Sequence, residues 1–359
     1  MRLLEPVQIG RSSLQNRMAM APMTRSRASV EGIVGDSTAL YYAQRASAGL
    51  IISEAINISE QAIGSPFTPG LYTPDQIEAW KKVTRAVHEK GGTLYAQLWH
   101  TGRVGHSLVK KGALPVAPSA IAIPGQQHFT MEGLKDYETP HALTVDEIQQ
   151  IIQDYQQAAS HAIEAGFDGV ELHAAFGYLP NQFLADSSNA RNDQYGGSIE
   201  NQNRFVLEAM HAIVAAVGEN RAAIRLSPTN TYNHITHRQP VEQFSALIER
   251  LNALPLAYLH LMKVPFSLDQ FPHYPVDVIE TLGSLSKHPV IANCGYTRET
   301  GEAELARGIA EMISYGTLFL ANPDLPRRFE MDAELNPVDG ATMYGGGDRG
   351  YIDYPFLNA

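Results

Sequence analysis

Short apolar runs alternate with amphipathic stretches along most of the chain. Eight such runs are rich in aliphatic residues: 18–23, 49–56, 93–100, 169–175, 222–228, 258–262, 289–295 and 311–316. Continuous apolar strands that alternate with helices are typical of a parallel sheet buried on both faces. The pattern therefore predicts a (β/α)8 TIM barrel. Barrels of this length are commonly one domain, which here would comprise residues 1–359.

Two of the intervening stretches carry clear helix signals. Residues 74–90 place four large apolar side chains on one helical face, and two glycines follow as a C-cap signal. Thr144 and Glu147 have the spacing of a capping box and begin a second amphipathic stretch that continues to Gly166. These stretches predict helices before the third and the fourth strand.

Three parts of the chain fall outside this alternation. Residues 1–17 alternate around Gly10 and are expected to form a hairpin that caps one end of the barrel. Residues 101–143 are rich in Gly, Pro and Ser, which predicts a long insertion after the third strand. Such loops usually build or cover the active site of a barrel. Residues 344–355 are rich in Gly and Tyr and are expected to return, ordered, over the barrel mouth, with a disordered tail as the alternative.

The charge and the cysteine content of the chain limit the binding partners and the cellular compartment that we expect. The chain has 27 basic and 38 acidic residues, a formal net charge of −11 at pH 7. Nucleic acids and anionic membranes bind basic patches, so neither is expected as a partner. The single cysteine, Cys294, allows no intramolecular disulfide, and the amino terminus lacks the apolar core of a signal peptide. We therefore expect a cytoplasmic protein, either a monomer or a homodimer.

The candidate chemistry lies at the end of the fourth apolar run. This run ends in His173, and Tyr178 follows five residues later. Both side chains would project into one cleft, where the imidazole could polarise an oxygen and the phenol could donate a proton. A competing reading pairs Glu54 with Glu171 as the two carboxylates of a glycosidase. No metal site is expected, because the thirteen histidines include no His-Glu-x-x-His pattern.

The residues around and after His173 resemble the signature of a known family. They read His-Ala-Ala-Phe-Gly-Tyr-Leu at 173–179, Asn-Ala-Arg-Asn-Asp-Gln-Tyr-Gly-Gly at 189–197 and Ser-Ile-Glu-Asn-Gln-Asn-Arg-Phe at 198–205. This block is similar to that of the old yellow enzyme family of flavin-dependent ene-reductases, specifically its N-ethylmaleimide reductase-like branch. The resemblance covers nearly the full chain. It implies non-covalent FMN, NAD(P)H as reductant and a small electrophilic alkene or quinone as substrate.

The resemblance also implies flavin contacts at strand ends around the barrel. Thr24 would hydrogen-bond the flavin O4, and Gln97 would bond the flavin pyrimidine with both the donor and the acceptor of its amide. Arg225 would face the N1–C2=O region, although a structural ion pair is the alternative for a cation in an apolar strand. The ring contacts implied in this way are Pro22, Met23, Thr24, Ala55, Gln97 and Arg225.

The flavin phosphate is expected at the ends of the seventh and eighth strands, where backbone N–H groups and a helix start are available. The implied contacts are Asn293, Cys294, Gly295, Gly316 and Thr317. The family usually has arginine where this chain has Thr317, so a hydroxyl replaces a cation. Either Arg298 or another nearby arginine compensates, or FMN binds less tightly.

The substrate side of the cleft shows two further departures from the family. His173 would hold the activating oxygen and Tyr178 would protonate the substrate carbon, as the resemblance implies. Phe176 stands where the family commonly has a second donor, His or Asn, and Ser65 stands where relatives often have tyrosine. Tyr351, in the Gly-rich tail, is expected to line the cleft.

These features together predict an NAD(P)H-dependent FMN oxidoreductase that reduces activated C=C bonds of α,β-unsaturated carbonyl or nitro compounds. A quinone or nitro-compound reductase on the same barrel is the alternative, and so is a flavin-binding barrel without enzymatic activity. Tyr178 separates these hypotheses, because the phenol is needed only where carbon is protonated.

Overall fold

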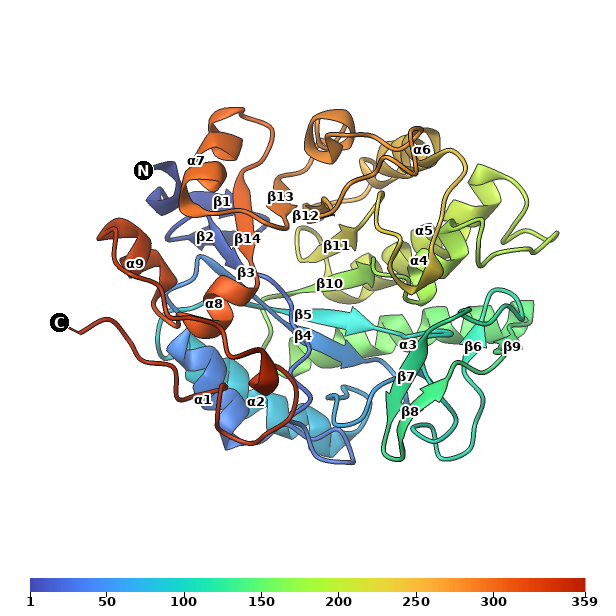
Figure 1. The fold of residues 1–359 in the computed structure, drawn as a ribbon, viewed down its shortest axis with the longest axis horizontal. Helices are drawn as coiled ribbons and strands as arrows, with labels where there is room; N and C mark the ends of the chain where they lie inside the picture. The colour runs from blue at the N-terminus through green and yellow to red at the C-terminus, as the bar shows by residue number, and fades with distance from the viewer. Residues whose placement is uncertain (359) are drawn as a thin grey trace.

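Eight parallel strands close into a barrel (Figure 1). The computed structural model describes residues 1–358. Around the ring, the strands are β3 (Met18–Met20), β4 (Leu50–Asn57), β5 (Leu94–Trp99), β10 (Gly169–Ala174), β11 (Ala222–Leu226), β12 (Leu256–Met262), β13 (Val290–Asn293) and β14 (Met312–Tyr315). β14 pairs with β3 and so closes the ring. Strands form at all eight predicted runs, and the predicted (β/α)8 barrel is confirmed.

Helices cover the outside of the barrel, because each has one apolar face to bury against the strands. They are α1 (Asp36–Gln44), α2 (Pro74–His88), α3 (Val145–Glu164), α4 (Leu179–Leu184), α5 (Ile199–Val217), α6 (Pro240–Leu251), α7 (Arg298–Ala306), α8 (Thr317–Ala321) and α9 (Leu325–Glu330), with a π-helical turn at Ile279–Gly283. The predicted capping box of α3 is present, since the Thr144 hydroxyl accepts from the Glu147 N–H and the Glu147 side chain accepts from the Thr144 N–H. No helix among residues 1–358 has the length and hydrophobicity needed to cross a membrane.

The predicted hairpin caps the amino-terminal end of the barrel. Strands β1 (Val7–Ile9) and β2 (Ser12–Leu14) pair in antiparallel fashion, and Ile9 and Leu14 join the apolar cluster inside the barrel. The turn requires glycine, because Gly10 has φ +55° and a Cβ there would lie 2.4 Å from the Asn220 carbonyl oxygen. The opposite, carboxyl end of the barrel is therefore the end that remains available for a site.

The predicted insertion after β5 contains two small sheets. Strands β7 (Gln127–Thr130) and β8 (Gly133–Asp136) form an antiparallel hairpin, and β6 (Val116–Ala117) pairs with β9 (His141–Ala142). In Figure 1 this insertion stands at the side toward which β5 points. The insertion is thus placed to wall the carboxyl end of the barrel.

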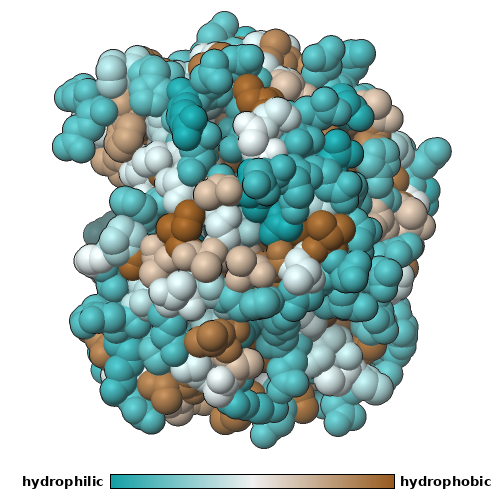
Figure 2. Space-filling model, turned by 90° about the vertical axis from the view of Figure 1, so that its right-hand side faces the viewer, coloured by the Kyte–Doolittle hydropathy of each residue, from teal (hydrophilic) through white to brown (hydrophobic). Residues whose placement is uncertain are grey.

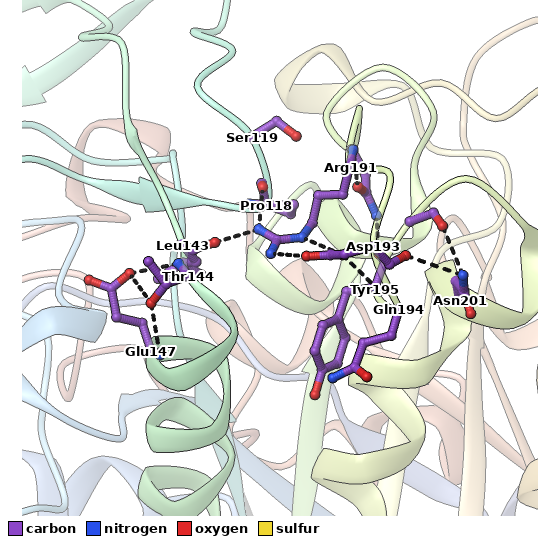
Figure 3. Close-up of polar contacts among 12 residues, drawn as sticks. Pro118, Ser119, Leu143, Thr144, Glu147, Arg191, Asp193, Gln194, Tyr195 and Asn201 are labelled. Carbon is purple, nitrogen blue, oxygen red and sulfur yellow. Dashed lines mark hydrogen bonds and ion pairs between the residues drawn. The ribbon is translucent and has the colours of Figure 1, made fainter.

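Arg191 ties this insertion to the segment that follows β10 (Figure 3). Its guanidinium donates to the carbonyl oxygens of Pro118 at 2.9 Å and Leu143 at 2.5 Å, which directly follow β6 and β9 of the insertion. It also pairs with Asp193 at 2.5 Å, whose carbonyl oxygen accepts from the Asn201 side chain in the first turn of α5. The charge-assisted bonds fix the geometry of the insertion. Residues 189–205 of the family signature therefore stabilise the scaffold, whereas residues 173–179 reach the site.

The carboxyl-terminal tail returns to the barrel mouth and is held there by two arginines. Arg25 donates to the carbonyl oxygens of Met343 at 3.0 Å and Gly350 at 2.7 Å. Arg27 donates to that of Thr342 at 2.9 Å. These bonds from the segment after β3 place residues 343–344 beside the pocket described next.

Candidate active site

An inner pocket of about 380 Å³ opens at the carboxyl ends of the strands. Barrels of this type carry their active sites at this end. Residues predicted for both the cofactor and the substrate meet here: Pro22, Met23, Thr24, Ala55, Gln97, His173, Phe176, Tyr178, Arg225 and Thr317. The structure therefore brings together side chains from strand ends that are far apart in the sequence.

His173, near the carboxyl end of β10, is an uncharged ring that faces this pocket. Its side chain is buried, and Nδ1 has no hydrogen-bond partner among residues 1–358. Burial, together with the nearby Arg225 and His260, holds the pKa of His173 well below its ordinary value. The ring is therefore neutral at physiological pH and can donate one N–H bond to an oxygen in the pocket.

Tyr178 is positioned by aromatic contacts on two sides. Its ring centroid lies 4.9 Å from that of Trp99 and 4.9 Å from that of His173, both in edge-to-face geometry. Gly177, with φ +79°, makes the turn that brings the phenol back over the imidazole. Burial raises the pKa of Tyr178 far above its ordinary value, so the phenol keeps its proton. It can therefore act as a proton donor.

Arg225, in β11, is a buried cation without a carboxylate partner. Its Nη2 donates to the Asn293 Oδ1 at 2.6 Å, while its Nε is buried and has no partner among residues 1–358. No ion pair to Arg225 occurs within the described chain, so the predicted alternative of a structural ion pair is wrong. The guanidinium is thus available to an electron-rich group in the pocket.

A polar relay crosses the barrel below the pocket. Gln97 donates from Nε2 to Glu171 at 2.7 Å, and the other Glu171 oxygen lies 2.9 Å from the His260 Nδ1. His260 in turn contacts the Ser314 hydroxyl at 2.8 Å. One N–H of the Gln97 amide is therefore occupied by protein, while the second N–H and the amide oxygen are left for the predicted flavin contacts.

The glycosidase alternative is wrong. Glu171 is fully buried and engaged in this relay, and Glu54 is buried against the segment after β3. Neither carboxylate is among the residues that line the inner pocket. Paired carboxylates flanking a sugar bond are therefore missing from the described site.

Phe176 occupies the edge of the pocket in a backbone conformation that is unusual for it. Its φ is +57°, a left-handed value that Asn, Asp and His adopt more readily than other non-glycine residues. Its ring lies 5.2 Å from the Arg225 Cζ and 6.1 Å from the His173 ring centroid. Its own N–H donates to the Ser227 hydroxyl, and the neighbouring Gly177 N–H donates to Asn181. This edge of the pocket thus presents an aromatic surface, and both backbone donors are occupied.

The residues predicted to contact the phosphate are only partly brought together. Thr317 begins α8 and lines the inner pocket, whereas Asn293 uses its side chain on Arg225 and on the Ser314 carbonyl. Cys294, Gly295 and Gly316 lie at the ends of β13 and β14 but do not line that pocket, and a role for these residues stays a prediction.

Arg298 is not free to replace the missing arginine at position 317. It forms an ion pair with Asp332 at 2.7 Å and donates to the Phe329 carbonyl at 3.2 Å. Lys263, which follows β12, donates its N–H to the Asn293 carbonyl oxygen at 3.2 Å, and its amine lies 3.8 Å from the Tyr296 ring centroid. Lys263 is therefore the better candidate for a compensating charge.

The expectation that Tyr351 lines the cleft is wrong. Its side chain is fully buried, stacks on Tyr41 with ring centroids 4.3 Å apart, and lies under Arg27. Tyr344, seven residues earlier in the same Gly-rich tail, lines the pocket instead. The reason is that Arg25 and Arg27 turn the tail so that residue 344 faces the mouth and residue 351 faces the core.

Five lining residues were not anticipated: Trp99, Tyr232, Leu320, Met343 and Tyr344. Trp99 lies near the end of the third predicted strand, close to Gln97 in the sequence. This position could have indicated that Trp99 lines the pocket. Tyr232 lies in a short 3-10 turn, Tyr232–His234, which has no periodic signature in the sequence. Loop residues of this kind can be placed only once the fold is known.

An outer pocket of about 670 Å³ adjoins the inner one. Both share Thr24, Trp99, Tyr178, Tyr232 and Tyr344, so the two hollows meet at the phenol of Tyr178. The remaining wall comes from the insertion and from residues 65–67, which include Ser65. A ligand in the inner pocket could therefore extend past Tyr178 into the outer pocket.

Glu54 makes folding stability depend on pH. Burial raises the pKa of its carboxyl to about 7, although the Arg25 N–H donates to it and opposes the shift. The folded state therefore favours the protonated form, and stability falls as pH rises from about 4.5 toward 7. We expect the wild type to lose about 3 kcal/mol of unfolding free energy more than Glu54→Gln between pH 5 and pH 8, since each pKa unit is worth about 1.4 kcal/mol.

Urea unfolding of both proteins at the two pH values measures this difference. Glu219→Gln, at an exposed glutamate, is the matched control and should behave as the wild type does. If the unfolding free energies of the wild type and Glu54→Gln changed with pH in parallel, the pKa of Glu54 would not be raised in the folded protein.

Comparison with known proteins agrees with the fold. Residues 2–336 match the model of the NADH:flavin oxidoreductase / NADH oxidase family. 12-Oxophytodienoate reductase 1 from Oryza sativa subsp. japonica is 43% identical over 358 residues, covering 99% of this chain and 93% of the relative. The old yellow enzyme homologue from Zymomonas mobilis has a TM-score of 0.95 at 42% identity, covering 99% of this chain and 100% of the other. Morphinone reductase in complex with tetrahydroNAD has a TM-score of 0.93 at 45% identity, covering 100% and 98%.

A (β/α)8 barrel with this pocket and these relatives defines an oxidoreductase of the flavin-dependent class. The chain belongs to the NADH:flavin oxidoreductase / NADH oxidase family and, within it, to the old yellow enzymes. The family predicted from the residues around His173 is confirmed, and the hypothesis of a barrel without enzymatic activity is wrong.

Proposed function

We propose that this protein binds FMN non-covalently and uses NAD(P)H to reduce activated C=C bonds of α,β-unsaturated carbonyl or nitro compounds. The observation that carries the proposal is the neutral His173 beside the protonated Tyr178, in a pocket that is also lined by Arg225, a cation without a carboxylate partner among the described residues. A hydrogen-bond donor to the substrate oxygen, a proton donor and a fixed positive charge are the groups this reduction requires from the protein.

The pocket residues fit a flavin. Trp99 Nε1, His173 Nδ1 and Arg225 Nε are buried polar atoms without a partner among residues 1–358. Buried donors that have no partner in the protein are commonly satisfied by a ligand or by water. Pro22, Met23 and Thr24 would contact the ring from the end of the first strand, with Ala55 and Gln97 beside them.

Bound FMN would accept a hydride from NAD(P)H and deliver it to the β-carbon of the alkene. Arg225, which lines the pocket, would stabilise negative charge on the pyrimidine end of the ring. His173 would donate its N–H to the activating carbonyl or nitro oxygen and so withdraw electrons from the alkene. Tyr178 would give its proton to the α-carbon.

A second candidate, the reduction of quinones, is favoured by one observation. Phe176 replaces a donor with an aromatic edge, and the nearby backbone N–H groups are occupied. Quinones spread charge over a wide π-system, so they depend less on a localised donor.

An absorption spectrum of the purified protein, followed by anaerobic mixing with NAD(P)H and then with an enone or a quinone, tests the proposal. A colourless protein that also fails to bind added FMN would overturn it. We also infer that residues 1–359 act as one FMN-binding domain, in the cytoplasm, as a monomer or homodimer and without a nucleic-acid partner.

Thr317→Arg is expected to tighten FMN binding on the order of tenfold to a hundredfold. A charge-assisted hydrogen bond contributes about 1.5–3 kcal/mol, and Thr317 lines the pocket with no cation in its place. Fluorescence titration of the apoprotein with FMN gives the dissociation constants. Equal constants for the two proteins would mean that another residue already supplies the charge, and Lys263→Met would then weaken binding in the wild type.

A further inference from the structure

The outer pocket differs from the inner one in its chemistry. No Asp, Glu, Lys or Arg is among its lining residues in the described chain. Its one histidine, His128, is buried, and burial lowers the pKa of the ring, which is therefore uncharged. A charged group entering this hollow would lose water without gaining an ionic partner, which is costly.

The same hollow collects large apolar side chains that the fold leaves exposed. Phe129 is 61% exposed, Leu134 62%, Tyr232 61% and Tyr344 67%, and all four line the outer pocket. Figure 2 shows the side of the molecule on the right of Figure 1, where hydrophobic residues gather in a band across the middle between hydrophilic ones. Exposed apolar side chains that converge on one hollow mark a binding site.

The hairpin of the insertion is built to present two of these side chains. Phe129 and Leu134 are cross-strand partners in the β7–β8 register, so they lie on one face of the hairpin. His128, on the opposite face, contacts the Gly64 carbonyl oxygen through Nε2 at 2.5 Å and the Tyr137 hydroxyl through Nδ1 at 3.3 Å. This anchor holds the hairpin against the loop after β4, so that Phe129 and Leu134 stay at the exposed edge of the hollow.

We propose that the outer pocket is a subsite for an uncharged, bulky hydrocarbon group carried by the substrate. The substrate would then be an activated alkene or quinone with an apolar extension. It would not be a small molecule, and its extension would not end in a carboxylate. The inference rests on the proposed function, because the reacting group of the same substrate would occupy the inner pocket. The dinucleotide half of NAD(P)H is a poor occupant, since its phosphates would meet no cation here.

Three 1,4-benzoquinones with the same reacting ring test the subsite: methyl, heptyl and 6-carboxyhexyl. Quinones are substrates under both candidate functions, and a saturated chain leaves the ring electronics unchanged. We expect the heptyl compound to have a KM at least tenfold below that of the methyl compound, since each buried methylene is worth about fourfold. The carboxylated chain of the same length should lose this gain. Equal KM values for methyl and heptyl, or for heptyl and carboxyhexyl, would overturn the proposal.

Two variants on the same hairpin locate the effect. Leu134→Glu puts a charge into the outer pocket, whereas Met131→Glu puts the same charge at an equally exposed position, 62% in both cases, outside that pocket. We expect the ratio of kcat/KM for heptyl over methyl to fall at least tenfold in Leu134→Glu and to stay unchanged in Met131→Glu. An equal fall in both variants would contradict the subsite.

Other occupants of the hollow give different results, and each would overturn the proposal. A raised KM for NAD(P)H in Leu134→Glu, with an unchanged heptyl ratio, would assign the hollow to the dinucleotide. A dimer in gel filtration that Leu134→Glu dissociates, again with an unchanged ratio, would assign it to a second copy of the chain.

Failure of the subsite can be told apart from failure of the proposed function. If no quinone or enone is reduced by the FMN-loaded protein with NAD(P)H, the proposed function fails. The subsite is then tested by titrating the same protein with 4-heptylphenol and 4-methylphenol and following tryptophan fluorescence, because Trp99 lines both pockets. Tighter binding of 4-heptylphenol in the wild type, lost in Leu134→Glu, supports the subsite, and equal binding overturns it.

Discussion

Tyr178→Phe will slow alkene reduction by about 10²–10⁴-fold and leave the reduction of the flavin by NAD(P)H nearly unchanged. The phenol is protonated and lies against His173, so its proposed task is to supply a proton to carbon. Transfer of a hydride to the flavin requires no such proton. Stopped-flow absorbance resolves the two half-reactions in one protein.

The contacts of Tyr178 define the control for this experiment. Its ring also packs edge-to-face on Trp99, and Tyr178→Phe keeps that packing while removing only the hydroxyl. A proportional fall in both half-reactions would therefore mean that the hydroxyl shapes the pocket and does not donate the proton. Quinone reduction in the same variant should be much less affected, because quinones need no protonation at carbon.

Phe176→His will raise kcat/KM for 2-cyclohexenone by roughly 10²–10³-fold. Negative charge develops on the activating oxygen during reduction, and one donor to such an oxygen is worth about 2.7–4 kcal/mol. In the proposed mechanism His173 alone would donate to that oxygen in the wild type, because the neighbouring backbone N–H groups already donate to Ser227 and Asn181. Histidine also suits the left-handed φ of +57° better than phenylalanine does.

The wild type should accordingly reduce quinones markedly better than 2-cyclohexenone, and the variant should narrow that gap. Phe176→Leu is the matched control, because it removes the aromatic ring over Arg225 without adding a donor. A wild type that already prefers the enone would contradict the argument from the missing donor. So would an equal gain in Phe176→Leu. If a water molecule supplied the missing hydrogen bond, the wild type would already prefer the enone.

Much of the barrel was predictable because its strands are short, apolar and buried on both sides. The residues of β4, β5 and β10 are all buried, which is why these strands are predominantly apolar in sequence. The start of α3 was predictable from Thr144 and Glu147, which form a local motif that depends on no distant contact.

The wall of the site was less predictable, for physical reasons that differ from one segment to the next. The β7–β8 hairpin has short strands, and Phe129 and Leu134 face a hollow, so its pattern matches neither a core strand nor a surface strand. Tyr344 and Tyr351 both belong to the Gly-rich tail, so the local sequence does not show which of them lines the pocket. The bonds of the tail to Arg25 and Arg27 place Tyr344 at the pocket and Tyr351 in the core. Contacts between segments more than 300 residues apart cannot be predicted from the local sequence of either segment.

The pairing of β3 with β14 constrains how the chain can be made into an active protein. β3 ends at Met20 and β14 begins at Met312, so the ring cannot close until residues 312–315 have left the ribosome. At typical rates of about 5–20 residues per second, synthesis takes on the order of half a minute. Throughout that time the open barrel has two unpaired strand edges that can attract other chains. Arg25 and Arg27 receive their partners later still, from residues 342–350, so the mouth of the site takes its final shape only after these residues have been synthesised.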